Sequence, residues 1–449
     1  MPSNDEHDMS YIMIEEFRRV ILSIESLNEF YLNLLSNIEK QKKDMEKNYE
    51  VGLYILKGLR KIQNIENCEE VEKNIEEIGN GILPRGMKVS EYAVIRLKKN
   101  EEKFDGFCII NRKHNELQSR YMDPREAERE YEKIEQYRNI LITSTLSNVI
   151  IIFEQYLAQV YKCLILKNPK KYFQNKQINI SNMFDKSIRE VVQECIRDEV
   201  ESNMFDSLKT LEMISKKEGI DINRYENILE EFKEIYFRRN IYVHNEGKVN
   251  DKYISSVSEK YRKNVKNEDK LLTDDEYLKK SINVLYKVVG ALFYEIQMQL
   301  DPKYEEWKHA FFSIAFKLLC NENYCVAQHF YYRLSKCQYS CFRDKTMSRI
   351  NYITSLKQQG YEKNVKDELE TLDVSIATEN FKIAKMCLED KNEEVYNALN
   401  KNYPDPYSAE LVRDWPLFIN FRKTEFYRKF VEEHAEDTNT IETTLLAND

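Results

Sequence analysis

Glycine and proline are scarce in this chain: its 449 residues contain 10 Gly and 8 Pro. Sheet proteins of this length need many tight turns, and these two residues are the usual means of making them. Their scarcity, together with abundant Lys, Glu, Leu and Ile, favours long helices. A charged fraction of 32% and a hydrophobic fraction of 42% fit a folded chain. We therefore predict an all-α protein, and the length predicts two or three domains.

Signs of secretion or membrane insertion are also missing. The nine cysteines are odd in number and scattered, so we interpret them as reduced thiols rather than a disulfide framework. The first six residues are acidic and polar, unlike a signal peptide. The most apolar stretch, Ile140 to Leu166, is interrupted by polar residues, which indicates a buried amphipathic helix and not a membrane span. We expect a cytoplasmic protein that does not contact membranes.

Positive charge is in deficit, since the formal net charge is -9. Phosphate attraction needs positive surface, so this value argues against a broad, non-specific nucleic-acid binder. A single basic cleft remains compatible with it, and any RNA hypothesis has to locate that cleft.

Three regions follow from the apolar periodicity: an N-terminal helical region (1–125), a central helical bundle (126–300) and a C-terminal helical region (301–449). Within the first, the segment Lys88 to Asn111 is ambiguous and could form a short strand pair. In the last, Tyr324 and Tyr361 each follow a helix and lie 37 residues apart. This pattern resembles degenerate tetratricopeptide-like helix pairs, whose period is about 34 residues.

The central region carries Arg239 and His244, separated by Asn240 and three apolar residues, at the end of an amphipathic helix. Positions five apart sit about 140° apart on an ideal helix. If the helix ends or tightens before His244, near Gly247, the imidazole can swing back toward Arg239. A neutral histidine can deprotonate a ribose 2′-OH, and an arginine can bind the phosphate oxygens as charge builds. Asn240 could orient either group, and no metal is required.

Arg239-Asn240-x3-His244, on the penultimate long helix of a helical domain, resembles the motif of the HEPN superfamily. Glu234-x3-Arg238-Arg239 looks like the acidic extension of some members. The resemblance covers about Arg138 to Leu300. It implies a metal-independent endoribonuclease of a toxin or antiphage system, without a cofactor. It also implies a homodimer, because HEPN domains usually pair and this chain has one motif.

Further residues around the motif are candidates for supporting roles or for substrate contacts. Glu234 and Arg238 are four apart and fit an ordinary helix ion pair, with a role in positioning Arg239 as the alternative. Glu154 either partners an arginine of the site or points to solvent. Tyr242 and Val243 are expected in the core. Two basic segments are candidate RNA contacts or solvated faces: Lys167, Lys170, Lys171 and Lys176, then Lys260, Arg262, Lys263 and Lys266.

The sequence disfavours a zinc site and a P-loop, and it leaves two alternative functions open. The cysteines and histidine between Cys320 and Cys341 lack the spacing of a zinc site, so we expect no metal. Gly247-Lys248 lacks the glycine-rich loop that precedes a P-loop lysine. The alternatives to the nuclease are a non-catalytic interaction protein, whose C-terminal helical region binds a protein partner or inhibitor, and a nucleotide-binding sensor.

Overall fold

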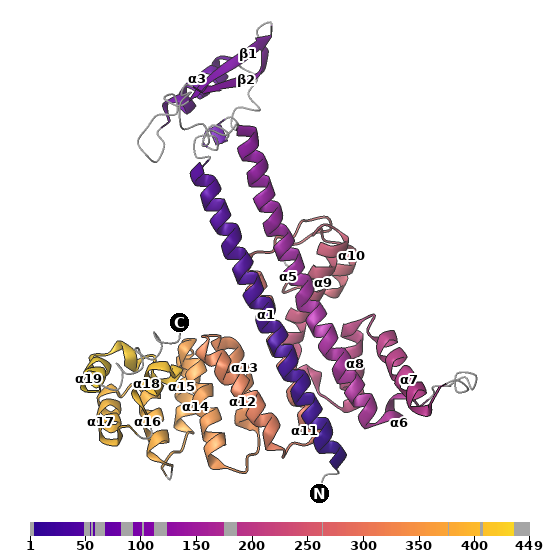
Figure 1. Ribbon diagram of the computed structural model, residues 1–449, viewed down its shortest axis with the longest axis vertical. Helices are drawn as coiled ribbons and strands as arrows, with labels where there is room; N and C mark the ends of the chain where they lie inside the picture. The colour runs from indigo at the N-terminus through magenta and orange to yellow at the C-terminus, as the bar shows by residue number, and fades with distance from the viewer. Residues whose placement is uncertain are drawn as a thin grey trace. The chain divides into compact units, whose positions relative to one another are not determined.

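The structure is a computed structural model, and it describes residues 4–48, 54, 57–58, 68–81, 93–100, 103–111, 124–174, 186–262, 264–375, 377–404 and 407–434. Helices make up most of these residues, so the predicted all-α class is confirmed (Figure 1). The chain divides into two compact units. The first contains Met1–Glu25, Asn148–Leu272 and Glu276–Asp449, and the second contains Ser26–Ser147 and Thr273–Asp275.

Two long helices belong in part to each unit: α1 (Asn4–Asn48) and α5 (Pro124–Lys167). The predicted boundaries at 125/126 and 300/301 therefore do not coincide with the units, and the three-region division stays a prediction. Within Glu128–Lys167 lies a window of mean hydropathy 1.5, long and apolar enough to cross a membrane by composition, yet 61% of it is buried inside the protein. That burial is what a core helix shows.

The second unit contains, besides its parts of α1 and α5, the helix α3 (Cys68–Asn80) and the strands β1 (Ala93–Asn100) and β2 (Lys103–Asn111). The strands pair antiparallel with Val94 opposite Ile110, and an irregularity interrupts the register between Lys98 and Lys99. The strand pair that the sequence left ambiguous is thus present. It is a local addition to a helical chain.

The first unit begins with a bundle around α5. Its shorter elements are α6 (Pro169–Tyr172), α7 (Ile188–Asn203), α8 (Ser207–Glu218), the 3₁₀ helix η3 (Ile222–Tyr225) and α10 (Asp251–Ser256). Its long helices are α9 (Glu226–His244) and α11 (Asp275–Leu300), the latter entering this unit at Glu276.

Most of helix α11 is buried in this unit, because its sequence is apolar on nearly every side. Phe293 of α11 stacks on Phe17 of α1 with ring centroids 4.0 Å apart. On the other side of the bundle, Phe153 of α5 meets Phe232 of α9 at 4.4 Å. Gln297 of α11 accepts a buried hydrogen bond from Ser10 of α1. These contacts fix α9, the helix that carries the motif, in a packed core.

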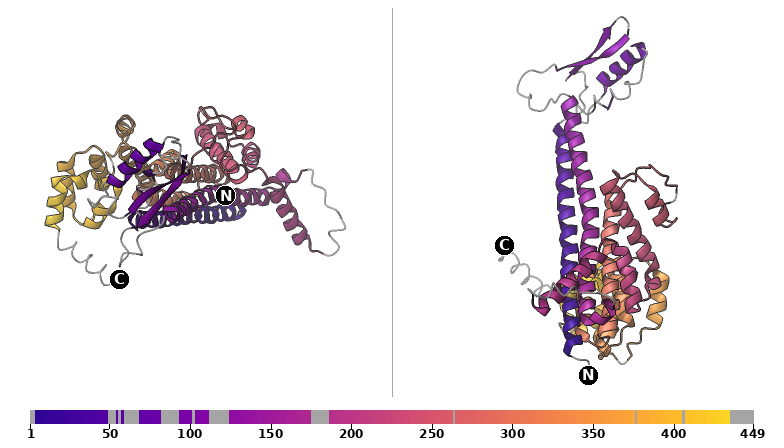
Figure 2. Two further views of the ribbon diagram at one scale, coloured as in Figure 1. Left: turned by 90° about the horizontal axis from the view of Figure 1, so that it is seen from above. Right: turned by 90° about the vertical axis from the view of Figure 1, so that its right-hand side faces the viewer.

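The remainder of the first unit is a series of helix pairs: α12 (Glu305–Cys320) with α13 (Tyr324–Lys336), α14 (Phe342–Gln358) with α15 (Glu362–Glu370), and α16 (Glu379–Leu388) with α17 (Asn392–Asn402). Short elements end it: α18 (Ala409–Asp414), η4 (Pro416–Phe418), η5 (Phe421–Lys423) and α19 (Glu425–Glu433). In Figure 1 the pairs follow one another from α12 to α17, and Figure 2 gives two further views of the chain.

The three pairs share one turn. Their first helices begin at Glu305, Phe342 and Glu379, each 37 residues after the one before. Each turn places one residue in the left-handed region: Glu322 (φ 59°), Gly360 (φ 76°) and Asp390 (φ 57°). The next residue of each turn donates its backbone N–H five residues back, as Tyr361 does to the Leu356 carbonyl. The pairs are therefore structural repeats with a common turn.

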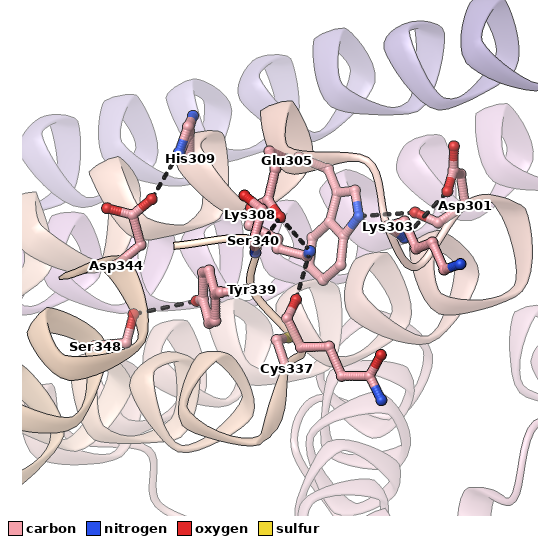
Figure 3. Close-up of polar contacts among 12 residues, drawn as sticks. Asp301, Lys303, Glu305, Lys308, His309, Cys337, Tyr339, Ser340, Asp344 and Ser348 are labelled. Atoms are coloured by element: carbon pink, nitrogen blue, oxygen red, sulfur yellow. Dashed lines mark hydrogen bonds and ion pairs between the residues drawn. The ribbon is translucent and has the colours of Figure 1, made fainter. Parts of the chain in front are cut away.

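A buried lysine joins the first pair to the second (Figure 3). The Lys308 side chain of α12 is 1% exposed, and its Nζ donates to the Gln338 carbonyl (2.7 Å) and to Glu305 Oε1 (3.1 Å). The same carboxylate oxygen accepts from the Ser340 backbone N–H at 3.2 Å. Because an unpaired buried ammonium is costly, these bonds hold the turn between α13 and α14 against α12.

Candidate functional site

Helix α9 brings the motif to one end of the bundle. Asp221 caps η3, which leads into α9 at Glu226. At the other end His244 is the last helical residue, and both Asn245 and Gly247 donate backbone N–H groups to the Ile241 carbonyl. Gly247 takes the left-handed conformation with φ 78°. The expected stop is present, but the helix continues through His244 and does not end before it.

Arg239 is held by α5. Its Nη2 lies 3.4 Å from Glu154 Oε1, and its side chain is 18% exposed. Ser207, at the start of α8, also donates to Glu154 Oε1, at 3.4 Å. The Arg239 Nε is buried, and no hydrogen-bond partner for it occurs in the described part of the chain. Of the two readings of Glu154, partner of an arginine is the correct one, and part of the guanidinium is left with unused donors.

His244 and Asn240 lie near this arginine on the same helix but are not bonded to it. The His244 side chain is exposed and Asn240 is half-buried. Among the residues that the structure describes, no hydrogen bond or ion pair joins either of them to Arg239. Because α9 stays helical through His244, the two side chains point about 140° apart around the helix axis. One chain by itself therefore does not assemble a cation and imidazole pair.

Glu234 and Arg238 form the predicted helix ion pair, and this pair is part of a buried network. The Arg238 Nε donates to Glu234 Oε1 at 2.8 Å, and these side chains are 12% and 5% exposed. The same carboxylate accepts from the hydroxyls of Tyr253 (2.7 Å) and Tyr277 (2.6 Å). Arg238 Nη1 also donates to the Leu272 carbonyl at 2.9 Å. The network ties α9 to α10 and to the start of α11.

Burial shifts the pKa values of several groups around the Glu154 and Glu234 carboxylates. Burial raises the pKa of Glu154, and the charge of Arg239 opposes that rise. Burial also raises the pKa of Tyr253 and Tyr277, and the adjacent Glu234 raises both further. For Arg238, burial lowers the pKa, but Tyr277 and Glu234 outweigh it and the net shift is upward. Arg238 is thus a fixed structural cation, whereas the Arg239–Glu154 pair is looser and partly open.

The two basic segments lie apart. Lys167 and Lys170 are exposed beside α6, and Lys171 is paired with Glu218 at 2.9 Å. In Figure 1, α6 lies far from α10. The second segment packs back onto α9: Tyr261 and Val265 contact the cluster formed by residues of α9 and α10.

In that second segment Lys260 is exposed, and the Arg262 Nε donates to the Val257 carbonyl at 3.0 Å. Lys266 is exposed, with its backbone N–H bound to Asp269. Lys176 and Lys263 lie outside the described residues. Only the second segment adjoins the end of α9 that carries His244.

No group of three or more His, Cys, Asp or Glu residues within the described ranges is arranged to hold a metal ion. Of the cysteine and histidine set at the first helix pair, His329 is partly buried with Nε2 3.1 Å from the Lys287 carbonyl, Cys337 is buried, and Cys341 is exposed. These residues face different surroundings on the repeat helices.

Sequence reasoning missed the partners that come from distant positions. Ser207, Tyr253 and Tyr277 contact Glu154 or Glu234 from other helices, and nothing in the local pattern marks them. Tyr242 is partly buried, as expected, with its hydroxyl bound to the Leu271 carbonyl at 2.7 Å. Val243, expected in the core, is 48% exposed. It lies next to His244, on the side of α9 that turns to solvent.

Comparison of the chain with protein-family models, with curated proteins and with solved structures finds no match. The assignment of function therefore depends on the residues themselves.

Proposed function

We propose that this protein is a cytoplasmic, metal-independent endoribonuclease of the HEPN type, acting as a toxin or antiphage effector. The observation that carries the proposal is the end of α9. There a half-buried guanidinium with unused donors, Arg239, is followed within five residues by an exposed histidine, His244. This pair supplies the two groups that RNA cleavage through the 2′-OH needs.

The reaction needs no co-reactant besides the RNA. The His244 imidazole takes the proton of a ribose 2′-OH, and the oxygen attacks the adjacent phosphorus. The bond from phosphorus to the 5′-oxygen breaks, and that oxygen takes up a proton from a second imidazole. The products are a 2′,3′-cyclic phosphate and a 5′-hydroxyl. Arg239 binds the phosphate oxygens as negative charge grows, and Asn240 orients the phosphate or the imidazole.

A second copy of the chain completes the proposed site. Arg239 and His244 diverge around α9, so the imidazole that serves one arginine has to come from a symmetry mate. Large apolar side chains near the motif are exposed in a way that suits such pairing: Phe205 (91%), Leu272 (84%) and Val243 (48%). Phe205 lies two residues before Ser207, and the Leu272 carbonyl binds Arg238.

The overall negative charge does not oppose RNA binding at this end. The stretch 248–270, which follows α9, contains seven Lys and Arg against four Asp and Glu. Part of it packs on α9, so Lys260, Arg262 and Lys266 are the proposed backbone contacts. The helix pairs of the C-terminal region are the proposed surface for a protein partner or inhibitor.

The test is cleavage of total RNA by purified protein in EDTA, with 2′,3′-cyclic phosphate ends as the readout. Wild type should cut, and His244→Ala and Arg239→Ala should not. His309→Ala is the matched control, because His309 is also exposed (62%) but pairs with Asp344 on the helix pairs. Cleavage by His244→Ala at the wild-type rate would refute the proposal, and inactivity of all variants and wild type would favour a non-catalytic platform. Sedimentation at micromolar concentration should give a dimer.

A further inference from the structure

Lys287 and Cys325 meet where α11 packs against α13. The Lys287 Nζ lies 2.8 Å from the Cys325 Sγ. One turn further along α13, the His329 Nε2 lies 3.1 Å from the Lys287 carbonyl oxygen, and the Phe330 ring lies against Gly290 of α11. Contacts between the two helices therefore hold this amine and this thiol beside each other.

The separation of the two atoms is short for a contact with sulfur. A hydrogen bond from nitrogen to the smaller oxygen atom is usually about 2.9–3.0 Å long. Among the described residues no carboxylate forms an ion pair with Lys287, whereas Lys280 of the same helix pairs with Glu231 at 3.2 Å. The thiol is thus the side chain that the Lys287 amine contacts.

Cys325 is also open to small oxidants. Its side chain is exposed, whereas Cys163, Cys337 and Cys387 are buried. Cysteines that act as redox sensors are exposed and lie in electropositive surroundings, and peroxide converts them to sulfenic acids. A sulfenic acid then condenses with a nitrogen or sulfur nucleophile within reach. The nucleophile in contact with Cys325 is the amine of Lys287.

We propose that hydrogen peroxide joins the Lys287 Nζ to the Cys325 Sγ through one bridging oxygen atom. A direct bond between nitrogen and sulfur is much shorter than 2.8 Å, so it would require the helices to approach each other. An inserted oxygen places two single bonds at an angle and spans about the separation that is already present. The proposal does not depend on the Arg239–His244 site.

The reaction takes two molecules of peroxide. The first oxidises the thiol to a sulfenic acid and leaves as water with the second oxygen retained on sulfur. In the second step the unprotonated amine and the sulfenic acid lose one hydrogen each, and the N–O bond forms. The second peroxide takes up both hydrogens and leaves as two waters. Sulfur and nitrogen each lose two electrons, and each peroxide accepts two.

The bridge would fasten the first helix pair to α11 under oxidising conditions. It closes a loop of the chain between positions 287 and 325, and a cross-link of this kind stabilises a fold by restricting the unfolded chain. A thiol reductant cleaves the O–S bond and restores the separate side chains.

The experiment treats the full chain with hydrogen peroxide and analyses its proteolytic peptides by mass spectrometry. Wild type should give two peptides linked between Lys287 and Cys325, heavier by one oxygen and lighter by two hydrogens than the separate peptides. Dithiothreitol should release them. Lys287→Arg and Cys325→Ser should give no linked peptides. The matched control is Lys280→Arg, which changes a lysine that Glu231 holds on the same helix, and it should give as much linked product as wild type.

Thermal unfolding provides a second readout. After identical peroxide treatment, wild type and Lys280→Arg should melt at a higher temperature than Lys287→Arg and Cys325→Ser. The proposal is overturned if Cys325 is recovered only as sulfinic or sulfonic acid, or if it forms a disulfide with the exposed Cys320. A link to Lys287 that contains no added oxygen overturns it equally.

Discussion

Replacing Glu234 by alanine should loosen the end of α9 that carries the motif. The substitution removes the carboxylate shared by Arg238, Tyr253 and Tyr277, whose donors reach it at 2.8, 2.7 and 2.6 Å. It leaves the Arg238 cation buried at 12% side-chain exposure without its counter-ion. Removing one partner of a buried ion pair costs about 3–5 kcal/mol. Such a loss is a large share of the stability of an ordinary domain.

Hydrogen exchange of backbone amides measures this locally, which suits a chain of two units. A loss of about 3 kcal/mol in local opening free energy corresponds to exchange faster by about a hundredfold. The acceleration should appear in residues 234–257, which span the second half of α9 and α10. In contrast, Glu15→Ala removes a pair with exposed side chains (56% and 43%) at 2.7 Å on α1, worth about 0–1 kcal/mol. Equal, small effects of both substitutions would show that the network does not hold α9.

Three further outcomes follow from contacts described above. Glu154→Gln keeps an acceptor for Arg239 and Ser207 but cannot ionise. Burial raises the pKa of Glu154 above its ordinary 4.5, so the protonated carboxyl stabilises wild type at low pH, and this stabilisation is lost as the pH rises through the folded pKa. The melting temperature of the variant minus that of wild type should therefore increase between pH 4 and 7. Burial raises the pKa of the Cys337 and Cys163 thiols to about 11, so iodoacetamide at pH 8 should alkylate the exposed Cys325 and Cys341 before these two, as mass spectrometry of peptides would show. Gly290→Ala places a methyl 2.4 Å from Cε1 of Phe330, at the contact of α11 with α13. It should lower the free energy of unfolding in urea by about 1–3 kcal/mol. Gly360→Ala has open space around it and meets only the strain of φ 76°. A Gly290→Ala variant as stable as wild type would mean that the two helices adjust freely.

The fold was predictable where the spacing of apolar residues and the residues that end helices determine local structure. Apolar spacing predicted the amphipathic helix that ends with the motif, and Gly247 indicated a stop close to it, because local sequence determines helices and their caps. The sequence also indicated the strand pair β1–β2 as one possible structure of the segment Lys88 to Asn111, which contains Val94 and Ile110. The division into two units could not be read, since α1 and α5 give no break where one unit gives way to the other.

The candidate site was predictable only in part. Arg239, Asn240 and His244 share one short segment, so their proximity follows from sequence. Their relative orientation depends on whether the last turn of α9 stays helical, a balance of small terms that the pattern does not resolve. The partners Ser207, Tyr253 and Tyr277 come from other helices. Tertiary packing alone brings them to Glu154 and Glu234, so no motif announces them.

The shared turn of the C-terminal helix pairs has an evolutionary implication. When helix starts recur every 37 residues and each junction repeats the same left-handed residue, gain or loss of one whole pair leaves the neighbouring junctions intact. The array can then vary in length among descendants while α9 and α11 stay unchanged. The partner binding proposed for the helix pairs and the chemistry proposed for α9 could then evolve at different rates.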